Sequence, residues 1–315
     1  MSRIYEALQK AESERTTERA PERERDPLMQ PTPLNGEMHA PAGVAEHEYA
    51  PIPQSVAEAV VEPFVPPARD GAGGLGEIAR RPWSPSLVQL PALLQRGQSV
   101  EQFRSLRSRI YEMRDIKPLK SILITSGMPQ EGKSFISINL ALSLARHKNS
   151  RVLLIDGDMR RFTLHQILGC ESQPGLAEYL SGKAGILDVM QKAAASPSGQ
   201  AVLPNLTFIP GGNGGDKAAD LSGSPRFGEL LRAVAPYFDW IIIDSSPVLP
   251  VSDAVNLARS CDGVLLVARE GVTKFPVAQR AQSELKASNV LGFVLNAVHE
   301  APEVGSYYGY DASQD

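Results

Sequence analysis

The segment from Gly127 to Ser134 constrains this chain more than any other, because it reads Gly-Met-Pro-Gln-Glu-Gly-Lys-Ser. An apolar, β-branched run at 121–126 precedes it, and a helix-forming run begins at Lys133. This G-x-x-x-x-G-K-S pattern, placed between a strand and a helix, is typical of a P-loop that binds nucleotide phosphates. Its glycines let the backbone turn successive N–H groups toward phosphate oxygens, and the helix amino terminus adds positive potential.

Two side chains of the loop carry the expected chemistry. Lys133 is expected to neutralise the β- and γ-phosphates of ATP, and the Ser134 hydroxyl is placed to bind Mg²⁺. The residues of the loop predicted to contact the nucleotide are Gly127, Met128, Pro129, Gln130, Glu131, Gly132, Lys133, Ser134 and Phe135. The chain is therefore predicted to bind ATP and Mg²⁺. The guanine-reading pattern Asn-Lys-x-Asp does not occur in the sequence, which argues against a GTPase.

From Ser99 onward, apolar strands alternate with helices. Strands are predicted at 121–126, 151–156, 206–210, 240–244, 263–268 and 290–298. Helices are predicted over 99–114 and from near Lys133, Leu176, Arg226, Asp253 and Val277. Near-continuous apolar strands separated by helices indicate a mostly parallel sheet with helices on both faces, which is a doubly wound α/β fold.

The first 95 residues differ in composition from the rest. Thirteen of the 25 prolines lie between Pro21 and Pro91, mixed with Glu, Arg, Ala and Gly. Such a segment buries too little apolar surface to fold alone, so 16–95 is predicted to be a disordered linker. The folded domain is predicted at 96–300, followed by a flexible tail at 301–315.

The first 15 residues show a helical pattern. Ile4, Leu8 and Ala11 fall on one face, flanked by Glu and Lys. A short amphipathic helix over 1–15 that docks a partner is one interpretation. A transient helix at a frayed terminus is an equally good one.

Charge and hydropathy exclude several classes of protein. The formal net charge is -4 and no basic domain is present, so no nucleic-acid partner is expected. No run approaches the ~18 apolar residues of a membrane span, and the amino terminus lacks the apolar core of a secretory signal. Cys170 and Cys261 form no paired motif, which suits a reducing compartment. The chain is therefore expected to be cytoplasmic, with any role at a membrane depending on a partner.

Acidic residues end two further predicted strands. Asp156 and Asp158 lie at the end of the second strand, and Asp244 ends a later one. Ligands of open α/β sheets bind at this edge, so the three carboxylates are expected to converge on a metal–phosphate centre. Mg²⁺ needs few direct carboxylate ligands, and Ser134, Asp156 and Asp244 are predicted to hold it. Capping of a following helix is the alternative for such an aspartate, and it is a fair rival for Asp158.

These motifs together resemble those of the bacterial tyrosine kinases (BY-kinases) of polysaccharide export, which have a MinD/ParA-like P-loop fold. The motifs are the P-loop, Ile155-Asp156-Gly157-Asp158-Met159-Arg160 and Ile243-Asp244-Ser245-Ser246-Pro247. The amino terminus, MSRIYEALQKAE, resembles the exosortase-associated tyrosine autokinase subgroup. The resemblance covers residues 99–310 and the first dozen, and it is specific because three motifs agree.

The resemblance implies roles for individual residues. The catalytic residues would be Lys133, Asp156, Asp158 and Asp244, with Asp156 orienting or deprotonating the acceptor hydroxyl. Independently of the resemblance, Arg160 and Arg161 are expected either to balance the charge of the transferring phosphate or to be solvated, with the charge-balancing role favoured for Arg160. The phosphate acceptors would be Tyr307, Tyr308 and Tyr310, which match the carboxy-terminal tyrosine cluster of the family.

Two further patterns gain an interpretation from the resemblance. Glu101, Arg104 and Arg107 stand as E-x-x-R-x-x-R, which resembles the subunit-contact motif that helps such kinases to form a ring. A solvated charged face is the alternative interpretation of that spacing. Asn296 ends the last strand and resembles the adenine-contacting asparagine of the MinD/ParA superfamily. An ordinary turn residue is an equal alternative for Asn296.

The implied function is an ATP-dependent protein-tyrosine autokinase that phosphorylates neighbouring subunits and regulates exopolysaccharide synthesis and export. The implied partners are further copies of the chain and a membrane chain-length-regulating protein, which would recruit it to the inner face of the plasma membrane. A ParA/MinD-like ATPase switch and a catalytically weak regulatory subunit are the alternatives. Such switch proteins carry a lysine at the position of Met128 and lack a tyrosine-rich tail.

Overall fold

The computed structural model describes residues 78–147, 150–194, 203 and 205–298. The predicted helix at 1–15, the predicted linker up to residue 77 and the tyrosine tail lie outside the described residues. Within the described part, no helix combines the length and the apolar character that crossing a membrane requires.

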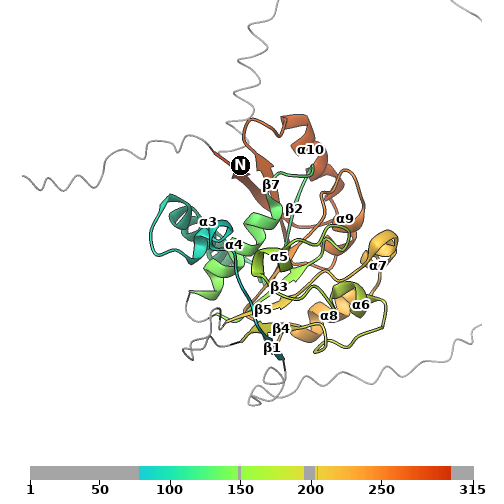
Figure 1. Ribbon diagram of the computed structural model, residues 1–315. Helices are drawn as coiled ribbons and strands as arrows, with labels where there is room; N and C mark the ends of the chain where they lie inside the picture. The colour runs from blue at the N-terminus through green and yellow to red at the C-terminus, as the bar shows by residue number, and fades with distance from the viewer. Residues whose placement is uncertain (1–77, 148–149, 195–202, 204, 299–315) are drawn as a thin grey trace, which may run out of the picture. The chain divides into compact units, whose positions relative to one another are not determined.

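The centre of the fold is an eight-stranded sheet in the order β1-β4-β5-β3-β6-β2-β7-β8 (Figure 1). The strands are β1 (Ala79–Arg81), β2 (Ser121–Ser126), β3 (Val152–Asp156), β4 (Gln191–Ala193), β5 (Leu206–Ile209), β6 (Trp240–Asp244), β7 (Gly263–Arg269) and β8 (Val290–Asn296). Neighbouring strands pair in parallel, except that β4 and β5 pair antiparallel. The prediction of a mostly parallel sheet is confirmed.

Helices cover both faces of the sheet. They are α3 (Gln98–Ile116), α4 (Lys133–Ala145), α5 (Leu164–Leu168), α6 (Leu176–Leu180), α7 (Ala218–Ser222), α8 (Arg226–Val234), α9 (Asp253–Ala258) and α10 (Phe275–Glu284), with short 3-10 turns η1 (Leu87–Gln89), η2 (Pro91–Leu93) and η3 (Gly215–Lys217). Successive residues of a strand point to opposite faces. In β6, Trp240 and Ile242 belong to the core with α3 and α4, whereas Ile241 and Ile243 belong to the core with α6, α8 and α9.

The elements that carry the motifs lie where the sequence predicts them. All six predicted strands are present, as β2, β3, β5, β6, β7 and β8, with ends within two residues of the prediction. Helices α4, α6, α8 and α9 begin at the predicted residues, and α10 begins at Phe275, two residues before the predicted Val277. The short elements β1, β4, α5 and α7 were not predicted.

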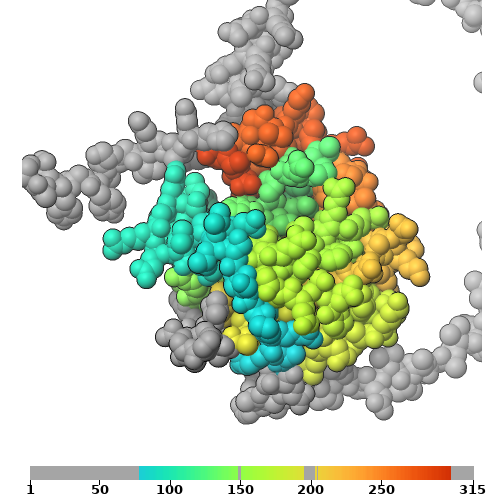
Figure 2. All heavy atoms as spheres, viewed as in Figure 1, coloured from blue at the N-terminus to red at the C-terminus, as the bar shows by residue number. Residues whose placement is uncertain are grey.

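The predicted linker is wrong for residues 78–95, which belong to the folded domain. β1 pairs with β4 at the edge of the sheet, and Leu90 and Ala92 are buried in the core that includes α4. The Asn139 side chain of α4 accepts a hydrogen bond from Ala92 N at 3.1 Å and donates one to Gln89 O at 3.0 Å. Figure 2 shows this stretch, in blue and cyan, as a band on the surface of the domain. The proline-rich composition did not predict that residues 78–95 are ordered. A few apolar side chains are enough to order such a segment when they pack against a core that the rest of the domain already forms.

Candidate active site

The P-loop joins β2 to α4 at the centre of the sheet, where β2 lies between β6 and β7. Gly132 has a φ of +96°, a left-handed backbone that favours glycine. A Cβ at this position would also lie 1.9 Å from Asn296 Nδ2, so a larger residue requires that amide to move. The first N–H groups of α4 have no partner within the helix, which leaves them available to an anion. The loop therefore has the backbone of a phosphate-binding cradle.

The Glu131 side chain points into the protein. Glu131 is 2% exposed, and its Oε2 accepts a hydrogen bond from Met128 N at 2.8 Å. Its Oε1 accepts a hydrogen bond from the Thr273 hydroxyl. Asn296 Nδ2 donates to the Glu131 carbonyl at 3.0 Å. Two side chains predicted to contact the nucleotide, those of Glu131 and Asn296, thus hold the loop itself.

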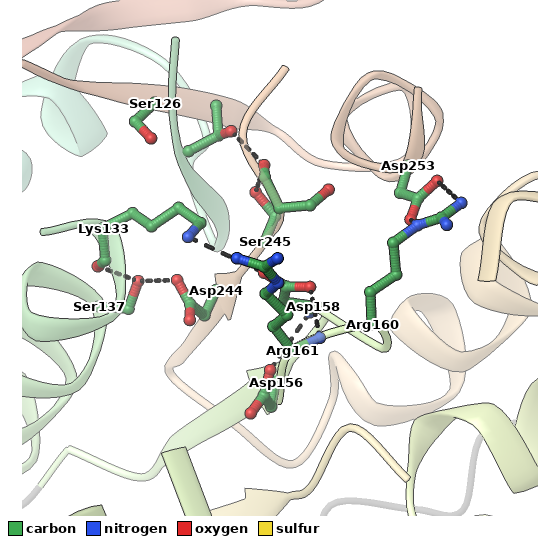
Figure 3. Close-up of polar contacts among 12 residues, drawn as sticks. Ser126, Lys133, Ser137, Asp156, Asp158, Arg160, Arg161, Asp244, Ser245 and Asp253 are labelled. Carbon is green, nitrogen blue, oxygen red and sulfur yellow. Dashed lines mark hydrogen bonds and ion pairs between the residues drawn. The ribbon is translucent and has the colours of Figure 1, made fainter. Parts of the chain in front are cut away.

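Lys133 and Asp158 form an ion pair at the mouth of the loop (Figure 3). Lys133 Nζ lies 3.8 Å from Asp158 Oδ2, and the two side chains are 13% and 8% exposed. Asp158 Oδ1 also accepts a hydrogen bond from Arg161 N at 3.0 Å. Asp158 therefore caps the turn after β3 and also presents a charge to Lys133. The capping interpretation and the active-site interpretation of Asp158 thus each describe one of its contacts.

Asp244 lies beside Asp156, because the two residues are register partners of β6 and β3. Asp244 is 1% exposed, and its Oδ1 accepts a hydrogen bond from Ser137 Oγ at 3.0 Å. Burial raises the pKa of Asp244 to about 6, although Lys133 and hydrogen bonds from Ser134 and Ser137 act to lower it. A cation bound beside this carboxylate would stabilise its charged form.

Asp156 is completely buried, and both of its oxygens are used by the backbone. Oδ1 accepts a hydrogen bond from Asp158 N and Oδ2 accepts one from Leu164 N, each at 3.2 Å. Burial raises the pKa of Asp156 well above its usual range, and the neighbouring Asp244 adds to the rise. Asp156 therefore shapes the segment that carries Asp158.

Arg160 lines the pocket in front of the P-loop, but its guanidinium is paired with another side chain. Its Nε lies 2.7 Å from Asp253 Oδ2, and its Nη2 lies 3.3 Å from Asp253 Oδ1. This hydrogen-bonded pairing is the main cause that raises the pKa of Arg160. Figure 3 shows the pair on the side of the site away from Lys133. Arg160 and Arg161 both line the pocket in front of the P-loop, so a role of Arg160 in balancing phosphate charge stays a prediction, although its guanidinium is already paired with Asp253.

A pocket of about 390 Å³ opens in front of the P-loop. Its lining includes Pro129, Lys133, Ser134, Asp158, Arg161 and Pro247. The pocket thus combines the predicted phosphate residues with an apolar rim, while Asp156 and Asp244 are buried rather than part of its wall.

A second cavity of about 440 Å³ lies between α3, the start of α4 and the end of β8. Its lining includes Phe103, Phe135, Leu295 and Asn296. Two of the predicted nucleotide contacts, Phe135 and Asn296, therefore reach this cavity and not the pocket in front of the loop.

The E-x-x-R-x-x-R residues of α3 contact their own chain. Arg104 Nη1 lies 2.6 Å from Glu101 Oε1, and these side chains are 47% and 64% exposed. Arg107 Nη1 donates to Ser143 O at 3.1 Å and to Ser143 Oγ at 3.3 Å. Arg107 therefore fixes α3 to α4, while Glu101 and Arg104 present charge at the surface.

Two residues of the site were not singled out from the sequence. Ser137 follows Lys133 by four residues, so both lie on one side of α4, and this spacing was the available signal. Thr273 reaches Glu131 only through the fold, across 142 residues of sequence, so no local pattern marks it.

A phosphate-binding loop at the centre of a mostly parallel sheet, with an aspartate ending the adjacent strand, defines a P-loop nucleotide-binding protein. The model of the AAA domain family matches residues 122–273. The chain is 33% identical over 226 residues to the tyrosine-protein kinase CpsD of Streptococcus agalactiae, which covers 71% of this chain and 94% of CpsD. It is 32% identical over 205 residues to the tyrosine-protein kinase ptk of Acinetobacter johnsonii, which covers 64% of this chain.

The solved kinase domain of the Escherichia coli tyrosine kinase ETK superposes with a TM-score of 0.59 and 30% identity, covering 67% of this chain and 80% of that one. This chain therefore belongs to the family of bacterial tyrosine kinases, as its motifs predicted. It spans 27% of the length of ptk, so the relative is much longer than the part that matches.

Proposed function

We propose that this chain is an ATP-dependent protein-tyrosine autokinase that transfers the γ-phosphate of ATP to tyrosines of a neighbouring copy. The acceptors are Tyr307, Tyr308 and Tyr310, which lie outside the described residues. The observation that carries the proposal is the pair of Lys133 and Asp158 at the wall of the pocket in front of the P-loop. A cation for the transferring phosphate and a carboxylate for the acceptor hydroxyl are thus adjacent.

Lys133 has two roles in this proposal. Without nucleotide it pairs with Asp158, which keeps both charges satisfied in a nearly closed corner of the site. With ATP bound, its ammonium group turns to the β- and γ-phosphates, where charge develops during transfer. That exchange leaves the Asp158 carboxylate free to accept the proton of an incoming hydroxyl.

Asp158 is better placed than Asp156 to meet the acceptor. Asp158 lines the pocket, whereas Asp156 has no exposed surface and accepts two backbone hydrogen bonds. We assign proton acceptance to Asp158 and the positioning of Asp158 to Asp156. The apolar rim at Pro129 and Pro247 suits the ring of a tyrosine side chain.

The oxygen donors of the site fit Mg²⁺, which prefers such ligands and keeps several waters. The Ser134 hydroxyl and the Asp244 carboxylate are hydrogen-bonded to each other and would hold the ion, together with Asp156 beside Asp244 on the neighbouring strand. Among the described residues, no three His, Cys, Asp or Glu side chains are grouped to bind a metal by themselves. Bound Mg²⁺ would neutralise charge on the β- and γ-phosphates.

The nucleoside position, the subunit contacts and the cellular location extend this proposal. The nucleoside would reach the second cavity, beside Phe135 and Asn296. Glu101 and Arg104 would contact a neighbouring subunit of a ring, since they are the exposed members of their motif. We further propose a cytoplasmic enzyme that a membrane chain-length-regulating protein recruits and activates during exopolysaccharide export.

A mixing experiment tests transfer between subunits. A Lys133→Met chain with an intact tail is combined with a chain in which Tyr307, Tyr308 and Tyr310 are replaced by Phe, and Mg-ATP is added. Loss of the Lys133 charge should abolish phosphoryl transfer in the first chain, and the second lacks acceptors. Phosphosite mapping should find phosphotyrosine on the Lys133→Met tail in the mixture and on neither chain alone.

Two results contradict the proposal in different ways. If the wild type is phosphorylated but the mixture is not, transfer occurs within one chain. If ATP is hydrolysed and no chain gains phosphotyrosine, the protein is an ATPase switch. Melting curves of the Lys133→Met chain establish that the variant is folded; a cooperative transition is expected, at a lower temperature than in the wild type because Asp158 loses its ion-pair partner.

A further inference from the structure

We infer that Thr273, acting through Glu131, is a positioning residue that sets the shape of the P-loop for nucleotide binding. Thr273 lies in the loop between β7 and α10, and it belongs to none of the sequence motifs. The inference rests on the proposed function, because it concerns the same nucleotide site.

The direction of the hydrogen bond between Thr273 and Glu131 is fixed by the other contact of the hydroxyl. Arg269 N donates to Thr273 Oγ1 at 2.8 Å. A backbone N–H can only donate, so the single hydroxyl proton remains for the Glu131 carboxylate. Thr273 thus accepts from its own loop and donates to the P-loop, and the loss of its hydroxyl would affect both segments.

Glu131 transmits this contact to the start of the P-loop. Glu131 is 2% exposed, and its carboxylate lies between two donors, the Thr273 hydroxyl and Met128 N. Hydrogen bonds to a charged acceptor are stronger than those between neutral groups, so the side chain has one favoured position. The β7–α10 loop is therefore tied through a single buried carboxylate to the residue that follows Gly127.

Further contacts from the same side hold the turn that follows. Gln130 has a φ of 65°, a conformation that residues other than glycine rarely adopt. The Gln130 carbonyl accepts a hydrogen bond from Arg269 Nη1 at 3.3 Å, and the Glu131 carbonyl accepts one from Asn296 Nδ2 at 3.0 Å. Both carbonyls are thus held from the β7 and β8 side, which leaves the amide side of the turn facing the phosphate position.

Thr273 does not line either of the two cavities around the P-loop. Any effect of Thr273 on the nucleotide must therefore pass through the loop. A less curved loop aligns fewer N–H groups with the phosphates, so nucleotide affinity should fall. The rate at saturating ATP should change little, because Lys133 and Asp158 remain in place.

The test compares Thr273→Val, which removes the hydroxyl and keeps the shape, with Thr273→Ser, which keeps the hydroxyl. Binding of a fluorescent ADP analogue with Mg²⁺ is measured on the full chain, together with KM for ATP, kcat and the melting temperature without nucleotide. Thr273→Val should weaken binding and raise KM about tenfold, equivalent to about 1.4 kcal/mol. Thr273→Ser should bind like the wild type, and neither variant should change kcat substantially.

A double-mutant cycle with Glu131→Ala shows whether Thr273 acts through Glu131. In the Glu131→Ala background, Thr273→Val should weaken binding much less than it does in the wild type, because only the contact with Arg269 N remains to be lost. If Glu131→Ala does not fold, Glu131→Gln replaces it. The amide has one acceptor oxygen where the carboxylate has two, so it cannot reproduce the separate hydrogen bonds from Thr273 and Met128 N.

Additive effects, or equal affinity of Thr273→Val and the wild type, would overturn the inference and leave the proposed function intact. A folded wild-type chain that binds no nucleotide would overturn both. If Thr273→Val also lowers the melting temperature, and if that destabilisation accounts for the whole loss of nucleotide affinity, the role of Thr273 is purely structural. This result would also overturn the inference.

Discussion

Asp156 and Asp158 are separated by one residue, yet their surroundings give them different parts in the site. The Asp156 carboxylate is fully buried and its oxygens accept backbone hydrogen bonds, while Asp158 is at the pocket wall beside Lys133. Desolvation opposes the charged form of Asp156, as the raised pKa of this residue indicates. A group that accepts a proton from substrate must reach it, and only Asp158 meets that condition.

Asparagine variants of the two aspartates should separate these parts. Asp158→Asn should lower kcat for phosphotyrosine formation about 100-fold or more, since a positioned general base contributes on that order. Asp156→Asn should lower kcat less, because its amide oxygen still accepts one of the two backbone hydrogen bonds. Binding of the ADP analogue is measured alongside, and Asp158→Asn should retain it. Equal losses of kcat in the two variants, or a larger loss in Asp156→Asn, would assign the role of proton acceptor to Asp156 instead.

The buried Asp244 should make the nucleotide-free domain less stable as pH rises. Its pKa of about 6 in the folded state lies above the ordinary value of 3.8, so the folded state binds this proton more tightly. The stabilisation is complete below about pH 4 and is lost as pH rises through about 6, amounting to roughly 3 kcal/mol. Urea unfolding without nucleotide or Mg²⁺ should show a smaller decline over this interval in Asp244→Asn than in the wild type. An equal decline in both would exclude Asp244 as its source.

At the scale of elements, sequence pattern predicted the long strands and failed on the short pieces. Strands such as β2 and β6 have apolar centres of three or four residues and are buried along their whole length, so their type and ends are clear from the sequence. The three-residue β1 and β4 and the five-residue α5 and α7 are too short for periodicity to register. They form because a neighbouring element offers a partner: β1 exists only as the parallel neighbour of β4.

The segment 78–95 should contribute measurably to stability. Leu90 is fully buried, so Leu90→Ala should lower the free energy of unfolding by about 2–5 kcal/mol. Val88 lies two residues away and is 94% exposed, which makes Val88→Ala a matched control with little expected effect. Urea unfolding of both variants measures the difference. Similar values for the two would show that the segment is dispensable, and a chain that starts at residue 96 would then be as stable as one that starts at residue 78.

At the scale of the whole molecule, the sequence could predict which strand ends meet and could not predict which side chains pair. The carboxyl ends of parallel strands meet at one edge, so Asp156 and Asp244 were expected to be neighbours, and they are register partners. Arg160 is paired with Asp253, 93 residues further along the chain. That partner depends on how α9 packs against the turn after β3, which no local pattern encodes.

The position of β8 at the edge of the sheet bears on whether a tail tyrosine can receive phosphate within its own chain. β8 is two strands from β2, a distance of about 10 Å, and Asn296 precedes Tyr307 by 11 residues, which span up to about 36 Å when extended. Reach alone therefore does not prevent a tyrosine from meeting the loop of its own chain, where a short tether gives an effective concentration on the order of millimolar. The proposed transfer between chains would therefore have to prevail through orientation. Its rate should then fall on dilution below the assembly concentration, whereas a reaction within one chain would be first order and insensitive to dilution.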